Sequence, residues 1–186
     1  MSEECLYYAP KHYLTENTDW PTAAICNDMS MEARTLALME GPYGRCVYHC
    51  DNDVVDHQVV NMEFDNGVTV AFTMSAFTKE CTRTIKLMGT SGEIHGHMGI
   101  NEIKVIDFKT DKTDTIQFEN IQGGHHGGDL GIMQDFVRLV QSNGALKGLT
   151  SADISVQSHI MAFAAEKARL TGSVVDIEAY MKELKE

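Results

Sequence analysis

The sequence predicts an α+β domain, with an open, mostly antiparallel β-sheet and helices packed on one face of that sheet. The first observation lies in residues 54–76, where two runs of alternating apolar and polar residues flank Asp65-Asn66-Gly67. Asn-Gly between two such runs predicts an antiparallel hairpin, because glycine accepts a positive φ without steric cost. The second observation is the helical spacing of apolar residues after residue 128.

The predicted hairpin has two unlike faces, because side chains alternate across a strand. One face of its second run is apolar and carries Val68, Val70, Phe72, Met74 and Ala76. The other face is small and mostly polar and carries Thr69, Ala71, Thr73 and Ser75. We expect helices to cover the apolar face, and we expect a ligand or a second subunit to meet the other.

Residues 1–27 are expected to form an irregular N-terminal segment that packs across another surface, because aromatic residues and prolines occur there without periodicity. Residues 28–186 are expected to form a single domain. Its first predicted element is a helix over residues 28–40, which Asp28 or Ser30 caps and Gly41 ends. A short strand is predicted next, over residues 45–50.

Further strands are predicted after the hairpin, and their short connections favour antiparallel pairing. They cover residues 83–88, 93–97, 102–108 and 115–118. A glycine-rich loop follows, and Asp129 is expected to cap a helix over residues 130–142. The expected buried stripe of that helix is Leu130, Met133, Phe136, Val137 and Val140.

Two helices are predicted at the C-terminal end. Residues 150–153 read as a capping box, Thr150-Ser151-Ala152-Asp153, that opens a helix running to Thr171. Gly172 is expected to end this helix, and a charged helix is predicted over residues 178–185.

The composition excludes several classes of partner. A formal net charge of -12 argues against nucleic acid and anionic membranes, which both bind basic surfaces. The five cysteines are odd in number and irregularly spaced, so we expect reduced thiols in a cytoplasmic protein. No signal peptide or transmembrane segment is recognised among the 186 residues.

Three polar clusters are candidates for a functional site. The first is the acidic run that ends at His57, the second is His95 with His97 in one strand, and the third is His125, His126 and Asp129 in the glycine-rich loop. The first two also suit a solvated loop and a solvated strand face. The third suits either an exposed turn or a ligand site, because imidazole offers hydrogen bonds to an alcohol or a carbonyl.

Several motifs are absent from the sequence. No Gly-x-Gly-x-x-Gly follows a strand and opens a helix, and neither a Walker motif nor a Gly-x-Ser-x-Gly elbow occurs. The sequence therefore assigns no cofactor-binding residue and no metal ligand.

Three segments together resemble the C-terminal domain of the Gfo/Idh/MocA oxidoreductases, from about Cys5 to the C-terminus. They are RCVYHCDNDVVDHQVVNMEFDNGVTVAFTMSAFT (residues 45–78), RTIKLMGTSGEI (residues 83–94) and GGHHGGD (residues 123–129). The resemblance implies a GAPDH C-terminal-like domain that binds a sugar or cyclitol. It also implies assembly into a homodimer or tetramer through the open sheet face.

In this family NAD or NADP is bound by a Rossmann domain that precedes the C-terminal domain. The resemblance therefore implies a piece of a longer protein, inactive by itself, whose catalytic residues lie in the preceding part. It suggests substrate contact by His125, while His126 stands where the family usually has glycine. Asp129 and His57 complete the candidate substrate-binding set.

Two other functions are open. One is a non-catalytic module that forms oligomers through its sheet or binds a small ligand. The other is a metal-dependent lyase or isomerase that uses His57, His125 and acidic neighbours.

Overall fold

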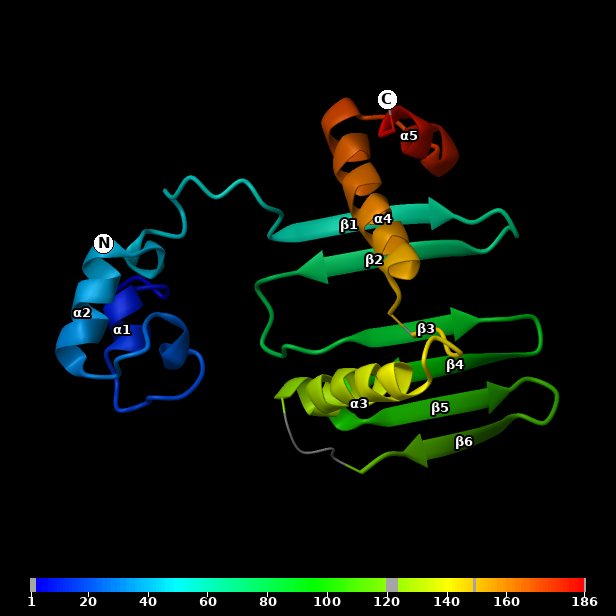
Figure 1. The fold of residues 1–186 in the computed structure, drawn as a ribbon, viewed down its shortest axis with the longest axis horizontal. Helices are drawn as coiled ribbons and strands as arrows, with labels where there is room; N and C mark the ends of the chain where they lie inside the picture. Colours follow the sequence, from blue (N-terminus) through cyan, green and yellow to red (C-terminus); the bar gives the residue numbers. More distant parts are fainter. Residues whose placement is uncertain (1–2, 120–123, 149, 186) are drawn as a thin grey trace. The chain divides into compact units, whose positions relative to one another are not determined.

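The computed structural model describes residues 3–119, 124–148 and 150–185, without the side chain of His126. It contains helices and six strands, and all strand pairs are antiparallel, so the predicted α+β class is confirmed. Contacts divide the chain into two compact units, Met1–Val55 and Asp56–Glu186 (Figure 1). The expected division after residue 27 and the GAPDH-like arrangement stay predictions.

The first unit is helical. Its elements are α1 (Ala9–Tyr13), η1 (Thr22–Ala24), α2 (Met31–Glu40) and η2 (Pro42–Gly44). The predicted cap of α2 is confirmed, because the Ser30 hydroxyl accepts a hydrogen bond from the Ala33 N–H. The predicted strand over residues 45–50 is wrong: bends and a turn occupy this stretch after η2, and none of the described strands pairs with it.

Arg34 joins α2 to the segment that follows α1. Its side chain is buried at 4% exposure, and its Nη1 atom donates to the carbonyls of Tyr13, Thr15 and Asn17 at 3.0, 2.8 and 3.3 Å. Leu38 is the other buried residue of α2. The N-terminal segment is thus held by a buried cation as well as by its aromatic residues.

The second unit begins with the predicted hairpin, which is confirmed. β1 (His57–Glu63) pairs with β2 (Thr69–Ser75) in a register that places Val60 opposite Phe72. Gly67 has a φ of +80°, which supplies the turn that the Asn-Gly pair predicts.

A second sheet has the order β3-β4-β5-β6 (Figure 1). Its strands are β3 (Thr84–Met88), β4 (Gly92–His97), β5 (Glu102–Asp107) and β6 (Lys112–Gln117). The single open sheet expected from the sequence is therefore wrong, because β2 and β3 do not pair. Residues 76–83 form bends instead of a short hairpin turn, so nothing fixes a register between these two strands.

The four-stranded sheet has one apolar face and one polar face. The register aligns Ile85, Gly96, Ile103 and Ile116 in one row, and Leu87, Ile94, Val105 and Asp114 in the next, so Asp114 is the one charged residue of these two rows. Ile85 and Leu87 are 58% and 52% exposed. By contrast, the side chains of Glu93 and Glu102 on the opposite face are only 19% and 20% exposed. Ile85 and Leu87 are therefore more exposed than these two glutamates.

Three helices complete the unit: α3 (Gly128–Gln141), α4 (Ala152–Thr171) and α5 (Ile177–Glu183). The predicted buried stripe of α3 is wrong, since all five of its apolar side chains are exposed. The predicted cap of α3 is also wrong, because Gly127 is the N-cap and Asp129 lies in the first turn. The periodicity identified the helix correctly, but it does not show whether a neighbour covers the helix.

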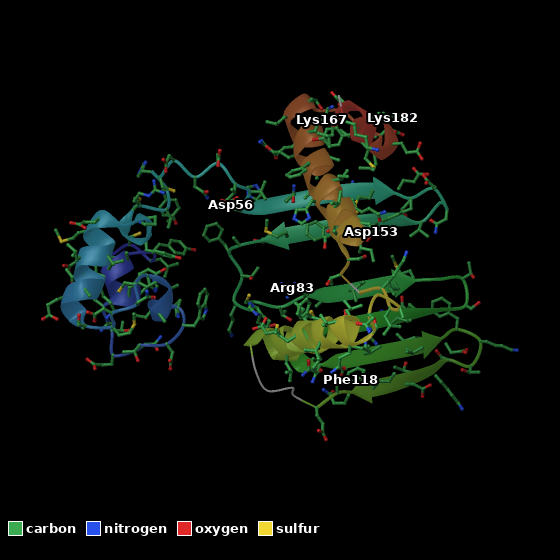
Figure 2. All side chains as sticks on the ribbon, in the orientation of Figure 1. Asp56, Arg83, Phe118, Asp153, Lys167 and Lys182 are labelled. Atoms are coloured by element: carbon green, nitrogen blue, oxygen red, sulfur yellow. The ribbon has the colours of Figure 1, made fainter. Side chains whose placement is uncertain are left out.

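The helices α4 and α5 contact each other. Ile160 and Ala164 are buried. Lys167, which lies on α4 (Figure 2), forms an ion pair with Glu183 and lies 4.6 Å from the ring centre of Tyr180. The predicted end at Gly172 is confirmed by its left-handed φ of +63°.

The predicted capping box of α4 is wrong in its details. The N-cap is Ser151 rather than Thr150, and no side chain caps the helix. The Ser151 hydroxyl instead donates to Asp153, which lowers the pKa of that carboxyl. Among the described residues, no helix has the length and apolar character needed to cross a bilayer.

Candidate functional site

The glycine-rich loop forms a short turn that leads directly into α3. η4 (Gly124–Gly127) contains His125 in a left-handed conformation at a φ of +50°, and Gly127 follows with a φ of +82°. Gly127 suits this position because left-handed backbone carries no steric cost for glycine. The two left-handed residues redirect the chain, so that His125 lies beside the first turn of the helix.

His125 and Asp129 form a hydrogen-bonded pair in this loop. The Nδ1 atom of His125 lies 2.9 Å from Oδ1 of Asp129, and the two side chains are 86% and 60% exposed. A carboxylate only accepts hydrogen bonds, so the imidazole nitrogen is the donor. The sequence predicted these two residues as site members but not this contact. The side chain of His126 lies outside the described residues.

A similar pair opens β1. The Nδ1 atom of His57 lies 2.5 Å from Oδ1 of Asp56, and both side chains are exposed. The acidic cluster predicted around His57 is divided, because Asp51 belongs to the first unit and pairs there with Arg45. A hydrogen bond from Arg45 lowers the pKa of Asp51. Within the second unit, His57 pairs with Asp56 of the predicted cluster.

His95 and His97 share the polar face of the four-stranded sheet, as the alternation predicts. The register places His95 between Lys86 on β3 and Lys104 on β5. Glu93 lies 2.8 Å from the Lys86 ammonium and 3.1 Å from His95 Nε2. The hydrogen bond from Lys86 is the largest cause of the lowered pKa of Glu93, with smaller contributions from the charge of Lys86 and from His95.

Charged side chains form a network on this polar face. Glu102 pairs with Lys104 at 3.0 Å, so each lysine of the row has a carboxylate partner. Among the described residues, no group of three histidine, cysteine or acidic side chains could hold a metal ion. The sequence analysis did not include Lys86 and Lys104 in a candidate site. The strand register would have placed them beside His95, but predicting the register requires knowing the turns.

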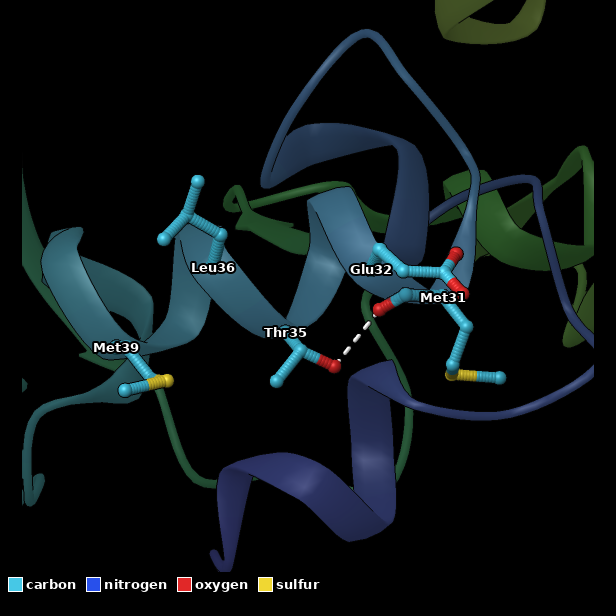
Figure 3. A pocket seen from close by; sticks show the side chains of 5 residues that line it. All are labelled: Met31, Glu32, Thr35, Leu36 and Met39. Atoms are coloured by element: carbon cyan, nitrogen blue, oxygen red, sulfur yellow. Dashed lines mark hydrogen bonds between the residues drawn. The ribbon is translucent and has the colours of Figure 1, made fainter.

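One shallow depression lies on the surface of the first unit, along α2. It is lined by Met31, Glu32, Thr35, Leu36 and Met39 (Figure 3). The Thr35 hydroxyl is turned back to the helix, donating to the Met31 carbonyl at 2.7 Å. Glu32 is the one acidic side chain of this lining, and two of the five lining residues are methionines. The depression therefore suits apolar contact better than acid–base chemistry.

The two histidine–aspartate pairs are therefore the candidate site residues that the structure describes in full. An imidazole held through Nδ1 leaves Nε2 to bind a hydroxyl or carbonyl. Comparisons with protein-family models, with curated proteins and with solved structures found no match for this chain. The family expected from the sequence stays a prediction.

Proposed function

We propose that this chain is the C-terminal substrate-binding and oligomerisation domain of an NAD(P)-dependent oxidoreductase of the Gfo/Idh/MocA type. Its substrate would be a sugar or cyclitol, and the domain would be inactive by itself, in the cytoplasm. The observation that carries the proposal is the His125–Asp129 pair in the glycine-rich loop that opens α3. The five free cysteines are consistent with a reducing compartment.

The chemistry of the pair suits a polyol. A sugar or cyclitol presents hydroxyl groups that both donate and accept, and an exposed imidazole nitrogen can bind one of them. The two pairs on β1 and in the loop would offer two such nitrogens, from His57 and His125. The nicotinamide would carry out hydride transfer, so this domain would bind and orient the substrate.

NAD or NADP is assigned to a Rossmann domain and not to these residues. The glycines of the Gly89–Gly92 turn join β3 to β4, so the turn does not open a helix. A phosphate-binding glycine turn needs a helix N-terminus behind it. The proposal therefore names no cofactor ligand in this chain.

Self-association into a homodimer or tetramer is the second part of the proposal. It is supported by the apolar face of the four-stranded sheet, where Ile85 and Leu87 are exposed, rather than by the small polar hairpin face on which the sequence placed the partner. Exposed apolar surface of this kind is typical of a protein interface. Mass measurement by light scattering tests it: Leu87→Glu should shift the mass towards the monomer, whereas Thr115→Glu, on the polar face, should not.

Ligand binding is tested by NMR titration of the full chain with myo-inositol and with glucose. We expect shifts of the His125 and His57 ring signals, and no stoichiometric binding of NAD by calorimetry. His125→Ala should weaken polyol binding, while His159→Ala, an exposed histidine whose Nδ1 bonds the Ser155 carbonyl, serves as the control. Tight NAD binding by this chain, or polyol binding unaffected by His125→Ala, would contradict the proposal.

A further inference from the structure

We propose that Asp129 is a positioning residue, which holds neutral His125 with its proton on Nδ1 and so makes Nε2 the acceptor for a hydroxyl group of the ligand. The identity of the ligand rests on the proposed function above. The orientation of the ring rests only on the geometry of the loop. Asp129 thereby takes a different role from the direct substrate contact that the sequence suggested.

The hydrogen bond determines the tautomer. A neutral imidazole has one donor and one acceptor nitrogen, and its partner decides which nitrogen is which. At 2.9 Å from a carboxylate oxygen, Nδ1 must carry the proton, so Nε2 is left with its lone pair. Free imidazole side chains favour the opposite tautomer, so the pair imposes a measurable change.

The loop makes this contact locally. His125 and Asp129 are four residues apart, and the left-handed Gly127 between them is the N-cap of α3. No other element of the fold is needed to bring the two side chains together. The His125 ring is 86% exposed, so a ligand can reach it.

The His57–Asp56 pair provides an internal comparison. It uses the same Nδ1-to-carboxylate contact but lies at the start of β1, on a different element. A change at Asp129 should therefore leave the His57 tautomer as it is. An unchanged His57 signal would show that the Asp129 substitution removes one contact and does not alter the histidines of the chain in general.

The test is two-bond proton–nitrogen NMR of the full chain with ¹⁵N-labelled histidine, at a pH where the rings are neutral. His125→Gln identifies the signals of His125. We expect the Nδ1–H form in the wild-type chain and a shift towards Nε2–H in Asp129→Ala. Asp129→Asn should shift in the same direction, since the amide can donate to Nδ1. Asp129→Glu, which keeps a carboxylate, should restore the Nδ1–H form.

The outcomes separate the two claims. An Nε2–H form in the wild-type chain, or an Nδ1–H form that persists in Asp129→Ala, overturns the positioning role. An Nδ1–H form that depends on Asp129 establishes it, with or without ligand. If myo-inositol and glucose then leave the Nε2 signal of His125 unmoved, the hydroxyl contact is refuted while the positioning role stands.

Discussion

Replacing Arg34 with methionine should strongly destabilise the first unit, because this guanidinium holds three backbone carbonyls of the N-terminal segment. One nitrogen serves all three, and it has two protons, so we count two full hydrogen bonds. Hydrogen bonds from charged groups contribute about 1.5–3 kcal/mol each. The two bonds therefore contribute about 3–6 kcal/mol.

Two effects reduce the stabilisation that these hydrogen bonds provide. Burying a guanidinium without a carboxylate costs free energy, and the Nε atom is buried with no partner among the described residues. Methionine removes both costs while keeping much of the apolar volume. The net loss of unfolding free energy in Arg34→Met should therefore be about 3 kcal/mol.

Near-ultraviolet circular dichroism during urea unfolding measures this loss selectively. Five of the six tyrosines lie in the first unit, at positions 7, 8, 13, 43 and 48. Two of them, Tyr13 and Tyr43, form an edge-to-face contact with ring centres 5.8 Å apart. The signal should thus report the unfolding of this unit.

The matched control is Arg45→Met, which removes an arginine of the same unit that pairs with the highly exposed Asp51. Exposed ion pairs contribute little to stability, so the urea midpoint of Arg45→Met should stay close to that of the wild-type chain. If Arg34→Met moves the midpoint no further than Arg45→Met does, the three carbonyl contacts do not hold the segment.

Three further predictions concern the second unit. Gly127→Ala should lower the free energy of unfolding by about 1–2 kcal/mol, because its φ of +82° is unfavourable for alanine; faster exchange of the hydrogen-bonded amides after the first turn of α3 measures this loss. Asp176→Ala should cost about 1 kcal/mol, since the side chain caps α5 by accepting from the Ala179 N–H at 2.8 Å; amide exchange in α5 that stays at the wild-type rate would contradict this. The lowered pKa of Glu93 should make the sheet less stable in acid. The folded pKa lies below the unfolded one, so its contribution is present above the unfolded pKa and disappears as the pH falls through the folded pKa. Melting temperatures of wild type and Lys86→Met between pH 7 and pH 3 test it, and the difference should shrink in acid.

Local signals in the sequence predicted much of the fold. The Asn-Gly turn predicted the hairpin, Ser30 predicted the start of α2, and Gly172 predicted the end of α4. Each of these depends on residues within a few positions of one another. The prediction of a strand over residues 45–50 was wrong, because strand propensity does not show whether a second strand is available to pair with it.

Features that depend on distant residues were not predictable in the same way. Arg34 donates to carbonyls 17 to 21 residues away in the sequence. No periodicity or capping pattern in the sequence predicts such a contact. The exposure of the α3 stripe was missed for the same reason: helical periodicity marks an apolar face, but not the surface that covers it. The row of Lys86, His95 and Lys104 needed the register of three strands.

The His125–Asp129 contact was not predicted, although it depends, like the hairpin turn and the helix caps, on residues close together in the sequence. The bond between His125 and Asp129 closes over four residues, in a turn fixed by Gly127. It should therefore form whether or not another domain or subunit is bound nearby. A ligand, by contrast, needs further contacts than one exposed nitrogen provides, because a single hydrogen bond with an exposed group contributes little net free energy. The orientation of His125 is thus a property of this loop, whereas tight binding of a polyol would require surfaces beyond it.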